Sequence, residues 1–378
     1  MSQDVLFTRE PVINKQRAIT ATRLRIHAGT CAGAVAALDA IGDDWPPARP
    51  VFVSLAGCAP DASLADWIAP EGAMMEIAAS ALADPACAEA ARQLAQAGVP
   101  LVLSDYKAGT DIPTGMSFRF VMADARVQPT AIRVPGILLA TGLSDPTGFD
   151  AAVKAGYGGA TGWFFKAGQV TAKKLAPAHA QIVRVLNLVR RNADAQQIEA
   201  ALKQDVALSF KLLRYINSAG FGLMCQVQSF RHAVVILGYE KLNKWLSLLL
   251  VTAGKDPSAP ALMQAAIARG RLMEVLGQEF FPREEHDNLF ITGAFSLLDK
   301  LLGTPMEKVL EEMTLPEPIS DALLGQDGAY TPFLRLARAC EEDSSEALAE
   351  LTHALGLQPD DVNRAQMSAL KFADTLEF

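Results

Sequence analysis

The chain has 378 residues, half of them apolar and a fifth charged, with a net charge of −8. This composition excludes a disordered or collagen-like chain, and the length suggests two domains. The five cysteines contain no CxxC pair, which argues against a disulfide framework or a zinc knuckle. No apolar run reaches the ~18 residues of a membrane span, and the N-terminus lacks the apolar region of a signal peptide. We therefore expect a cytoplasmic protein.

Up to about residue 168, short apolar runs alternate with Ala-rich helical stretches. This alternation predicts parallel strands joined by helices, in an open sheet or a barrel. An Ala-rich segment over 78–97 ends at Gly98, as helices commonly do. The expected strands cover residues 51–55, 74–77, 101–103, 118–122 and 137–140.

From about residue 175 the pattern changes to helices alone. Asp194 and Asp205 are expected to cap two of these helices at their N-termini. Gly238 is expected to end another. The predicted helices cover residues 181–191, 194–203, 205–216, 230–237, 239–254, 261–280 and 289–302. The sequence thus predicts an all-α second domain over 178–378, after a linker at 169–177.

Several short blocks lie between residues 204 and 238: QDVALS, KLLR, NSA, FG, SFRHA and LG. In this order and spacing they resemble the HDOD domain, a bacterial signalling module related to HD phosphohydrolases but lacking their metal ligands. The motif residues are Asp205, Asn217, Ser218, His232 and Gly238. For His232 a core position is the main alternative to a ligand role. For Asn217 and Ser218 the alternatives are a turn and a binding role.

The first half carries the blocks REPVI at 9–13, a strand at 19–26, ATGLS at 140–144 and TGWFF at 161–165. These blocks resemble a degenerate EAL domain, a TIM-type barrel that hydrolyses cyclic di-GMP. Together with FITGAFSLLD at 290–299, they are similar to two-domain EAL–HDOD (YuxH-type) bacterial signalling proteins. The predicted fold is therefore α/β plus all-α, with a shortened EAL-like barrel over 1–168. Because eight βα units typically need ~250 residues, one or more units should be reduced or missing.

The EAL resemblance implies a degenerate site in which most of the metal-binding residues are replaced. Active members use carboxylates at the ends of strands to hold two metals that activate water. The corresponding positions hold Thr22, Ser54, Ser104, Asp105, Met122, Ser144 and Thr161. Asp105 and Glu76 alone keep a carboxylate, and the alternative for Asp105 is a solvated residue that closes a strand. We expect no catalysis, no metal and no other cofactor.

The HD-type metal pair is also replaced, because the matching helix places Ser296 and Leu297 at its two positions. A literal His286-Asp287 pair lies ~10 residues earlier, next to Glu284 and Glu285. A charged segment of this kind is typical of a solvated loop or a helix cap. We therefore expect no metal at His286.

Charge is unevenly distributed along the second half. Residues 171–245 contain eleven Lys and Arg against four Asp and Glu, and residues 246–378 contain ten against twenty-two. Either the two portions compensate each other within one domain, or the basic portion faces an acidic partner. The candidate interaction surface comprises Lys173, Lys174, Arg184, Arg190 and Arg191, and we expect its arginines to project toward water.

The sequence therefore predicts a non-catalytic signal-transduction protein that acts through protein–protein contact. The resemblance implies a place in cyclic di-GMP-related signalling. Expected partners are signalling proteins or a second copy of the chain. Nucleic acid is disfavoured, because the basic run over 171–193 has no aromatic residue, and no membrane contact is expected. The alternatives are a cyclic di-GMP receptor using Arg23, Arg25 or Arg119, and a residual metal-dependent phosphohydrolase.

Overall fold

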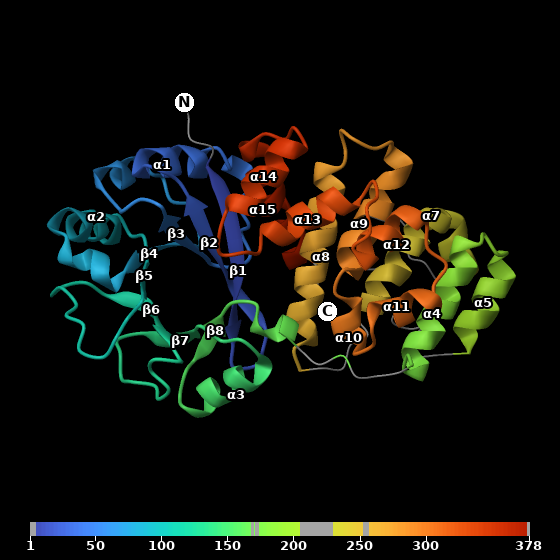
Figure 1. The fold of residues 1–378 in the computed structure, drawn as a ribbon, viewed down its shortest axis with the longest axis horizontal. Coiled ribbons are helices and arrows are strands. Elements are labelled where there is room, and N and C mark those ends of the chain that lie inside the picture. Colours follow the sequence, from blue (N-terminus) through green and yellow to red (C-terminus); the bar gives the residue numbers. More distant parts are fainter. Residues whose placement is uncertain (1–4, 168–169, 171–173, 205–229, 252–256, 376–378) are drawn as a thin grey trace. The chain divides into compact units, whose positions relative to one another are not determined.

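The computed structural model describes residues 5–167, 170, 174–204, 230–251 and 257–375. The chain divides into two compact units (Figure 1). The barrel unit contains residues 1–168 and 335–374, and the helical unit contains residues 169–334 and 375–378. Among the described residues, no helix is both long and apolar enough to cross a membrane.

The barrel unit is built on a closed barrel of eight strands in sequence order. The first strand is antiparallel to both of its neighbours, and all other neighbouring strands are parallel. The carboxyl ends of the parallel strands therefore open at one end, which we call the barrel mouth. The strands are β1 (Leu6–Asn14), β2 (Ile19–His27), β3 (Val51–Ala56), β4 (Ala73–Ala78), β5 (Leu101–Ser104), β6 (Phe118–Asp124), β7 (Ile137–Thr141) and β8 (Gly159–Thr161).

The barrel is shortened in its helices and keeps all its strands. The α-helices between strands are α1 (Cys31–Asp39), α2 (Pro85–Gln96) and α3 (Pro146–Lys154). The connections 105–117 and 125–136, described throughout, contain no helix. Prolines and glycines interrupt both connections, and such residues disfavour helix formation. The expected reduction of βα units is therefore confirmed for the helices after β5 and β6, and it is wrong for the strands.

An apolar layer fills the barrel interior on the side away from the mouth. It consists of Val12, Ala21, Phe52, Met74, Val102, Met122 and Leu139, with Phe120 packed against it. Side chains alternate between the two faces of a strand, so residues two positions nearer the mouth also point inward. On β2, β3, β4 and β5 these residues are Arg23, Ser54, Glu76 and Ser104. The mouth is thus lined by polar side chains above an apolar floor.

The last helices of the chain belong to the barrel unit. They are α14 (Glu346–Ala354) and α15 (Pro359–Thr375), preceded by the end of α13 (Thr331–Ala339). The buried amides of Asn363 and Gln366 bond to the backbone of β1. This differs from the expected division, in which residues 178–378 formed one HDOD domain. Hydrophobic periodicity could not reveal it, because these contacts come from polar side chains.

The helical unit is all-α, as expected. Its helices are α4 (Pro177–Arg190), α5 (Ala195–Lys203), α7 (Phe230–Val251), α8 (Ala259–Leu276), α9 (His286–Phe295), α10 (Leu298–Leu302), α11 (Met306–Glu311) and α12 (Glu317–Leu324). The Asp194 carboxylate accepts from the backbone N–H of Gln197 and caps α5, which confirms the predicted cap. At Gly238 the backbone leaves helical geometry, with φ 73° and ψ 169°. The predicted break is therefore present as a kink inside α7.

Helices α8 and α9 cross at two glycines. A Cβ atom on Gly293 would lie 2.6 Å from the carbonyl oxygen of Arg269, and one on Gly270 would lie 2.6 Å from that of Phe290. Glycine is therefore required at this crossing, because any side chain would force the helices apart. Of the HDOD motif residues, Asp205, Asn217 and Ser218 lie outside the described residues, as does the side chain of His232.

Candidate site at the barrel mouth

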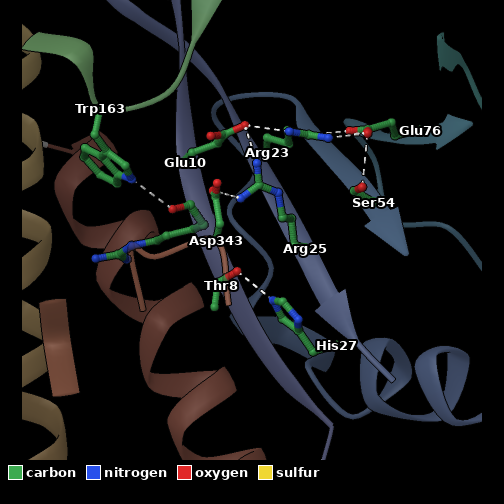
Figure 2. Close-up of polar contacts among 10 residues, drawn as sticks. Thr8, Glu10, Arg23, Arg25, His27, Ser54, Glu76, Trp163 and Asp343 are labelled. Carbon is green, nitrogen blue, oxygen red and sulfur yellow. Dashed lines mark hydrogen bonds and ion pairs between the residues drawn. The ribbon is translucent and has the colours of Figure 1, made fainter. Parts of the chain in front are cut away.

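Arg23 is the central residue of the barrel mouth (Figure 2). Its Nε donates to Glu76 Oε2 at 2.6 Å and its Nη2 to Glu76 Oε1 at 2.5 Å. Its Nη1 donates to Glu10 Oε1 at 2.7 Å. A guanidinium that binds a carboxylate through two parallel hydrogen bonds makes a strong and directional contact. Arg23 therefore joins β1, β2 and β4 across the interior.

Glu76 is buried and ionised. Its exposure is 5%, and Ser54 Oγ donates to its Oε1 at 3.1 Å. Burial raises the pKa of Glu76. The positive charge of Arg23 and the hydrogen bonds from Arg23, Ser104 and Ser54 lower it, and the resulting pKa lies below its usual range. Burial likewise lowers the pKa of Arg23, but the two carboxylates raise it above its ordinary value. Each group keeps its charge because the other is present.

The ion pairs continue from the interior to the surface. Arg25 Nη2 lies 3.2 Å from Glu10 Oε1, and Arg25 Nη1 donates to Asp343, which lies just after α13. Glu76, Arg23, Glu10, Arg25 and Asp343 thus alternate in charge, and we call these five residues the ion ladder (Figure 2). Its inner end is buried, whereas the Asp343 side chain is 88% exposed.

His27 lies next to the outer end of the ladder. Its Nε2 shares a hydrogen bond with Thr8 Oγ1 at 2.8 Å (Figure 2). Burial and the positive charge of Arg25 lower the pKa of His27, and Asp343 partly offsets them. Near neutral pH the ring is therefore predominantly uncharged.

The candidate residue Thr22 does not face the barrel interior. Ala21 belongs to the interior core, so alternation points Arg23 inward and Thr22 outward. A ligand for an ion in the mouth must project inward. The residue of β2 that projects into the mouth is therefore Arg23, which brings a positive charge there. That Thr22 corresponds to the signature Glu stays a prediction.

Four further EAL-like positions lie inside the barrel. Ser54 and Ser104 both donate hydrogen bonds to the Glu76 carboxylate, so they stabilise its charge. Met122 belongs to the apolar core, and Thr161 is buried opposite Val12 of β1. These side chains hold the arrangement of Glu76 or fill space, and none supplies a negative charge.

Three other candidates are exposed to solvent. Asp105 is exposed and has a left-handed backbone, with φ 53°, which suits a short turn after β5. Ser144 is exposed and donates its Oγ to Asp145 at 2.9 Å. Arg119 is exposed on β6, between Phe118 and the inward-packed Phe120. Asp105 and Ser144 follow the carboxyl ends of β5 and β7, so they lie at the solvent-exposed rim of the mouth.

The barrel mouth does not fit a pair of divalent metals. Such a site needs several carboxylates free to bind the ions. Here Glu10 and Glu76 are both bonded to Arg23, and Asp124 at the end of β6 is paired with Arg126 at 2.7 Å. Within the described ranges, no group of three or more His, Cys, Asp or Glu residues could hold a metal ion. A side-chain cation occupies the place where a metal would need its ligands.

The HD-type positions of the helical unit also serve structure. Ser296 Oγ donates to the Gly293 carbonyl at 2.7 Å and accepts from Arg269 Nη1 at 2.9 Å. Leu297 is buried. His286 begins α9, and its Nε2 lies 3.0 Å from the Phe281 carbonyl. The following Asp287 pairs with Lys244 at 2.8 Å. The His-Asp pair therefore begins a helix, where both side chains are partly buried and bonded to neighbouring residues.

Only some residues of the candidate interaction surface are exposed to solvent. Arg190 is half-buried, its Nη1 donates to the Thr314 carbonyl at 3.3 Å, and burial lowers its pKa to about 10. The expectation that it projects toward water is wrong, because it helps to attach α4 to the segment after α11. Lys174, Arg184 and Arg191 are exposed, although Arg191 also donates to Thr314. Lys173 lies outside the described residues.

The exposed arginines line a groove along α4, with a volume of about 310 Å³. Leu175, Val183 and Leu188 give it apolar walls, Arg184 and Arg191 add positive charge, and Glu312 faces them. The side-chain amide of Asn187 fixes one side, because it bonds the Glu312 carbonyl and the Thr314 N–H, both at 2.8 Å. The groove combines an apolar surface with net positive charge.

Comparison with known protein families gives a match in the helical unit. The model of the HDOD domain matches residues 175–309. The chain is 25% identical over 230 residues to the cyclic di-GMP phosphodiesterase CdgJ of Vibrio cholerae, covering 60% of this chain and 53% of CdgJ. It is 23% identical over 245 residues to the protein YuxH of Bacillus subtilis, covering 64% and 59%. The chain thus spans little more than half the length of these relatives.

Among solved structures, the EAL domain of FimX from Pseudomonas aeruginosa, bound to c-di-GMP, matches with a TM-score of 0.30 and 12% identity, over 43% of this chain and 88% of that one. The chain joins a closed eight-stranded barrel to a helical unit that contains the HDOD match. Its similarity to CdgJ and YuxH agrees with that architecture, and the predicted fold class is confirmed.

Sequence reasoning missed two residues of the site. Glu10 lies in the REPVI block, where it was taken as part of a family motif, and Asp343 lies far away in a run of acidic residues. A signal for Glu10 existed, because an acidic residue within a strand of otherwise apolar character usually needs a buried partner. For Asp343 no such signal exists, because its ion pair with Arg25 depends on the tertiary fold that brings residue 343 next to β2.

Proposed function

We propose that this protein is a non-catalytic signal-transduction protein of cyclic di-GMP-related bacterial signalling, and that it acts by regulated contact with other proteins. One observation carries the non-catalytic part: the Arg23 guanidinium lies between Glu10 and Glu76 inside the barrel mouth. The similarity to CdgJ and to EAL domains supports the signalling network.

Electrostatics explains why this arrangement opposes a phosphodiesterase. A metal in the mouth would have to compete with Arg23 for both carboxylates. Two positive unit charges 4 Å apart repel by about 4 kcal/mol at an effective dielectric constant of about 20, and a divalent ion doubles this. The neutral groups Ser54 and Ser104 beside Glu76 do not compensate for that repulsion. Both carboxylates are already paired with Arg23.

Hydrolysis and binding assays test the proposal directly. Purified protein with cyclic di-GMP and Mg²⁺ or Mn²⁺ should give no metal-dependent product above a protein-free blank. Product that disappears in Glu76→Gln or in Asp105→Ala would refute the non-catalytic assignment. Calorimetric titration of the same samples separates the alternative, because heat without turnover would indicate a cyclic di-GMP receptor.

For the contact itself, we propose that the groove along α4 takes an acidic segment of a partner protein. The apolar walls offer burial, and the exposed charges of Arg184, Arg191 and Lys174 favour a partner of opposite sign. Charge of this kind accelerates association and makes it dependent on salt, because the screening length falls to about 8 Å at physiological ionic strength.

Charge reversal tests the groove. Poly-L-glutamate serves as a model acidic partner, titrated at low and high salt. Arg184→Glu with Arg191→Glu should abolish salt-sensitive binding. The matched control is Lys107→Glu with Arg133→Glu, two exposed positions in the barrel unit, which should leave it unchanged. Equal binding in both variants would refute the groove. Loss of an oligomer in the groove variant alone, seen by light scattering, would identify a second copy as the acidic partner.

A further inference from the structure

Strand β1 extends well beyond its neighbour β8. The pairing between them covers Val12 to Asn14 of β1 and Gly159 to Thr161 of β8. Among the described residues, no strand pairs with residues 5–11 on this side. A strand edge of this length exposes backbone donors and acceptors that need partners.

The indole of Trp163 donates to the Arg9 carbonyl, and the end of the chain supplies further partners. Asn363 Oδ1 accepts from the Phe7 N–H and its Nδ2 donates to the Val5 carbonyl, both at 2.9 Å. This is the pair of bonds that a residue of a neighbouring parallel strand would make. Gln366 Nε2 donates to the Phe7 carbonyl at 2.9 Å, and the Cys340 carbonyl accepts from the Arg9 N–H at 2.8 Å. The amides thus replace a missing strand.

Residues 340–374, which we call the C-terminal strap, also bind the barrel through charge. Asp343 pairs with Arg25, the last basic residue of the ion ladder. Glu341 pairs with Lys166 and lies 3.8 Å from Arg9. The strap therefore holds the edge of β1 by hydrogen bonds and the outer end of the ladder by an ion pair.

We propose that the C-terminal strap is a switch element coupled to the barrel mouth through the ion ladder. The ladder is continuous, because Glu10 Oε1 accepts from Arg23 and also forms an ion pair with Arg25. A change at the inner end alters how strongly Glu10 holds Arg25, and hence how Arg25 holds Asp343. A ligand or partner that competes at the mouth would loosen the strap, and removal of the strap would loosen the mouth. Such coupling is reciprocal.

Hydrogen exchange of the full chain measures docking of the strap. The Phe7 and Arg9 amides report it, because their acceptors are Asn363 and Cys340. Glu76→Gln acts at the far end of the ladder and should speed exchange of these two amides, by about 5- to 150-fold if the coupling is of typical size. The Met75 amide, bonded to the Pro100 carbonyl, serves as reference for the rest of the barrel.

The controls separate coupling from general loss of stability. Asp150→Asn removes a carboxylate that pairs with Arg17 in the same unit but lies outside the ladder, and it should leave the Phe7 and Arg9 amides unchanged. Asn363→Leu removes both hydrogen bonds between Asn363 and the backbone of residues 5 and 7 and should directly speed exchange of the Phe7 amide. The reciprocal variant, Asp343→Asn at the exposed end, should shift the Nε–H resonance of Arg23. The proposal is wrong if Glu76→Gln leaves Phe7 and Arg9 unchanged or speeds Met75 equally.

Discussion

Replacing Arg23 by Met keeps a long side chain but removes the charge that Glu76 needs. Glu76 would remain buried, with Ser54 and Ser104 as its remaining partners. Removing one partner of a buried ion pair typically costs about 3–5 kcal/mol, because the other charge is left uncompensated. At about 2–4 °C per kcal/mol for a unit of roughly 200 residues, the barrel unit should melt about 6–20 °C lower at pH 8.

The pH dependence of this loss identifies its cause. In the natural protein the pKa of Glu76 is below its usual value of 4.5, so its ion pair stabilises the fold above that pH. This stability disappears as the pH falls through the lowered pKa. In Arg23→Met, burial dominates and raises the pKa of Glu76, so the variant is penalised as the pH rises through that raised value. The difference between the two proteins should therefore shrink as the pH falls from 8 to 5.

Thermal melts followed by calorimetry and circular dichroism at several pH values provide the assay. Arg92→Met is the control, since Arg92 pairs with the exposed Glu89, and such surface pairs contribute about 0–1 kcal/mol. Adding Glu76→Leu to Arg23→Met should restore much of the stability, because it removes the unpaired charge. A loss in Arg23→Met no larger than in Arg92→Met, or one independent of pH, would refute the role assigned to the ladder.

Three further outcomes are expected. Gly293→Ala should destabilise the helical unit by about 1–3 kcal/mol in a calorimetric melt and spare the barrel transition, because its Cβ would lie 2.6 Å from the Arg269 carbonyl. Burial raises the pKa of Cys340 to about 12, so Ellman's reagent at pH 8 should label it only after denaturation; labelling in the native state would contradict its burial. Protein purified without chelator should carry less than one equivalent of zinc, iron or manganese by elemental analysis, and a full equivalent lost in His286→Ala would contradict this.

The strands could be predicted because buried parallel strands appear as short apolar runs, and five expected runs lie within β3 to β7. Which face of β2 lines the barrel interior could not be predicted. One face of β2 carries Thr22, Leu24 and Ile26, and the other carries Ala21, Arg23 and Arg25. Because both faces of a barrel strand are covered, this alternation does not tell which face lines the interior, and a shift of one residue would exchange them. Only the position of Ala21 in the core resolves it.

The helical unit was predictable where local signals exist, as at the Asp194 cap and the Gly238 kink. The position of the C-terminal strap was not. Asn363 and Phe7 are 356 residues apart along the chain, and a buried amide bonding a strand edge leaves no periodic pattern. The burial of Arg190 was missed for a related reason, because its acceptor at Thr314 follows a different helix.

The strap also has a consequence for synthesis. All eight strands are translated well before Asn363 and Gln366. At typical elongation rates of about 5–20 residues per second, the roughly 200 intervening residues take about 10–40 s. During that interval the nascent barrel has an uncovered β1 edge, which is open to pairing with any extended chain nearby. Ribosome-bound chains that end before the strap should therefore depend on chaperones more than complete chains do.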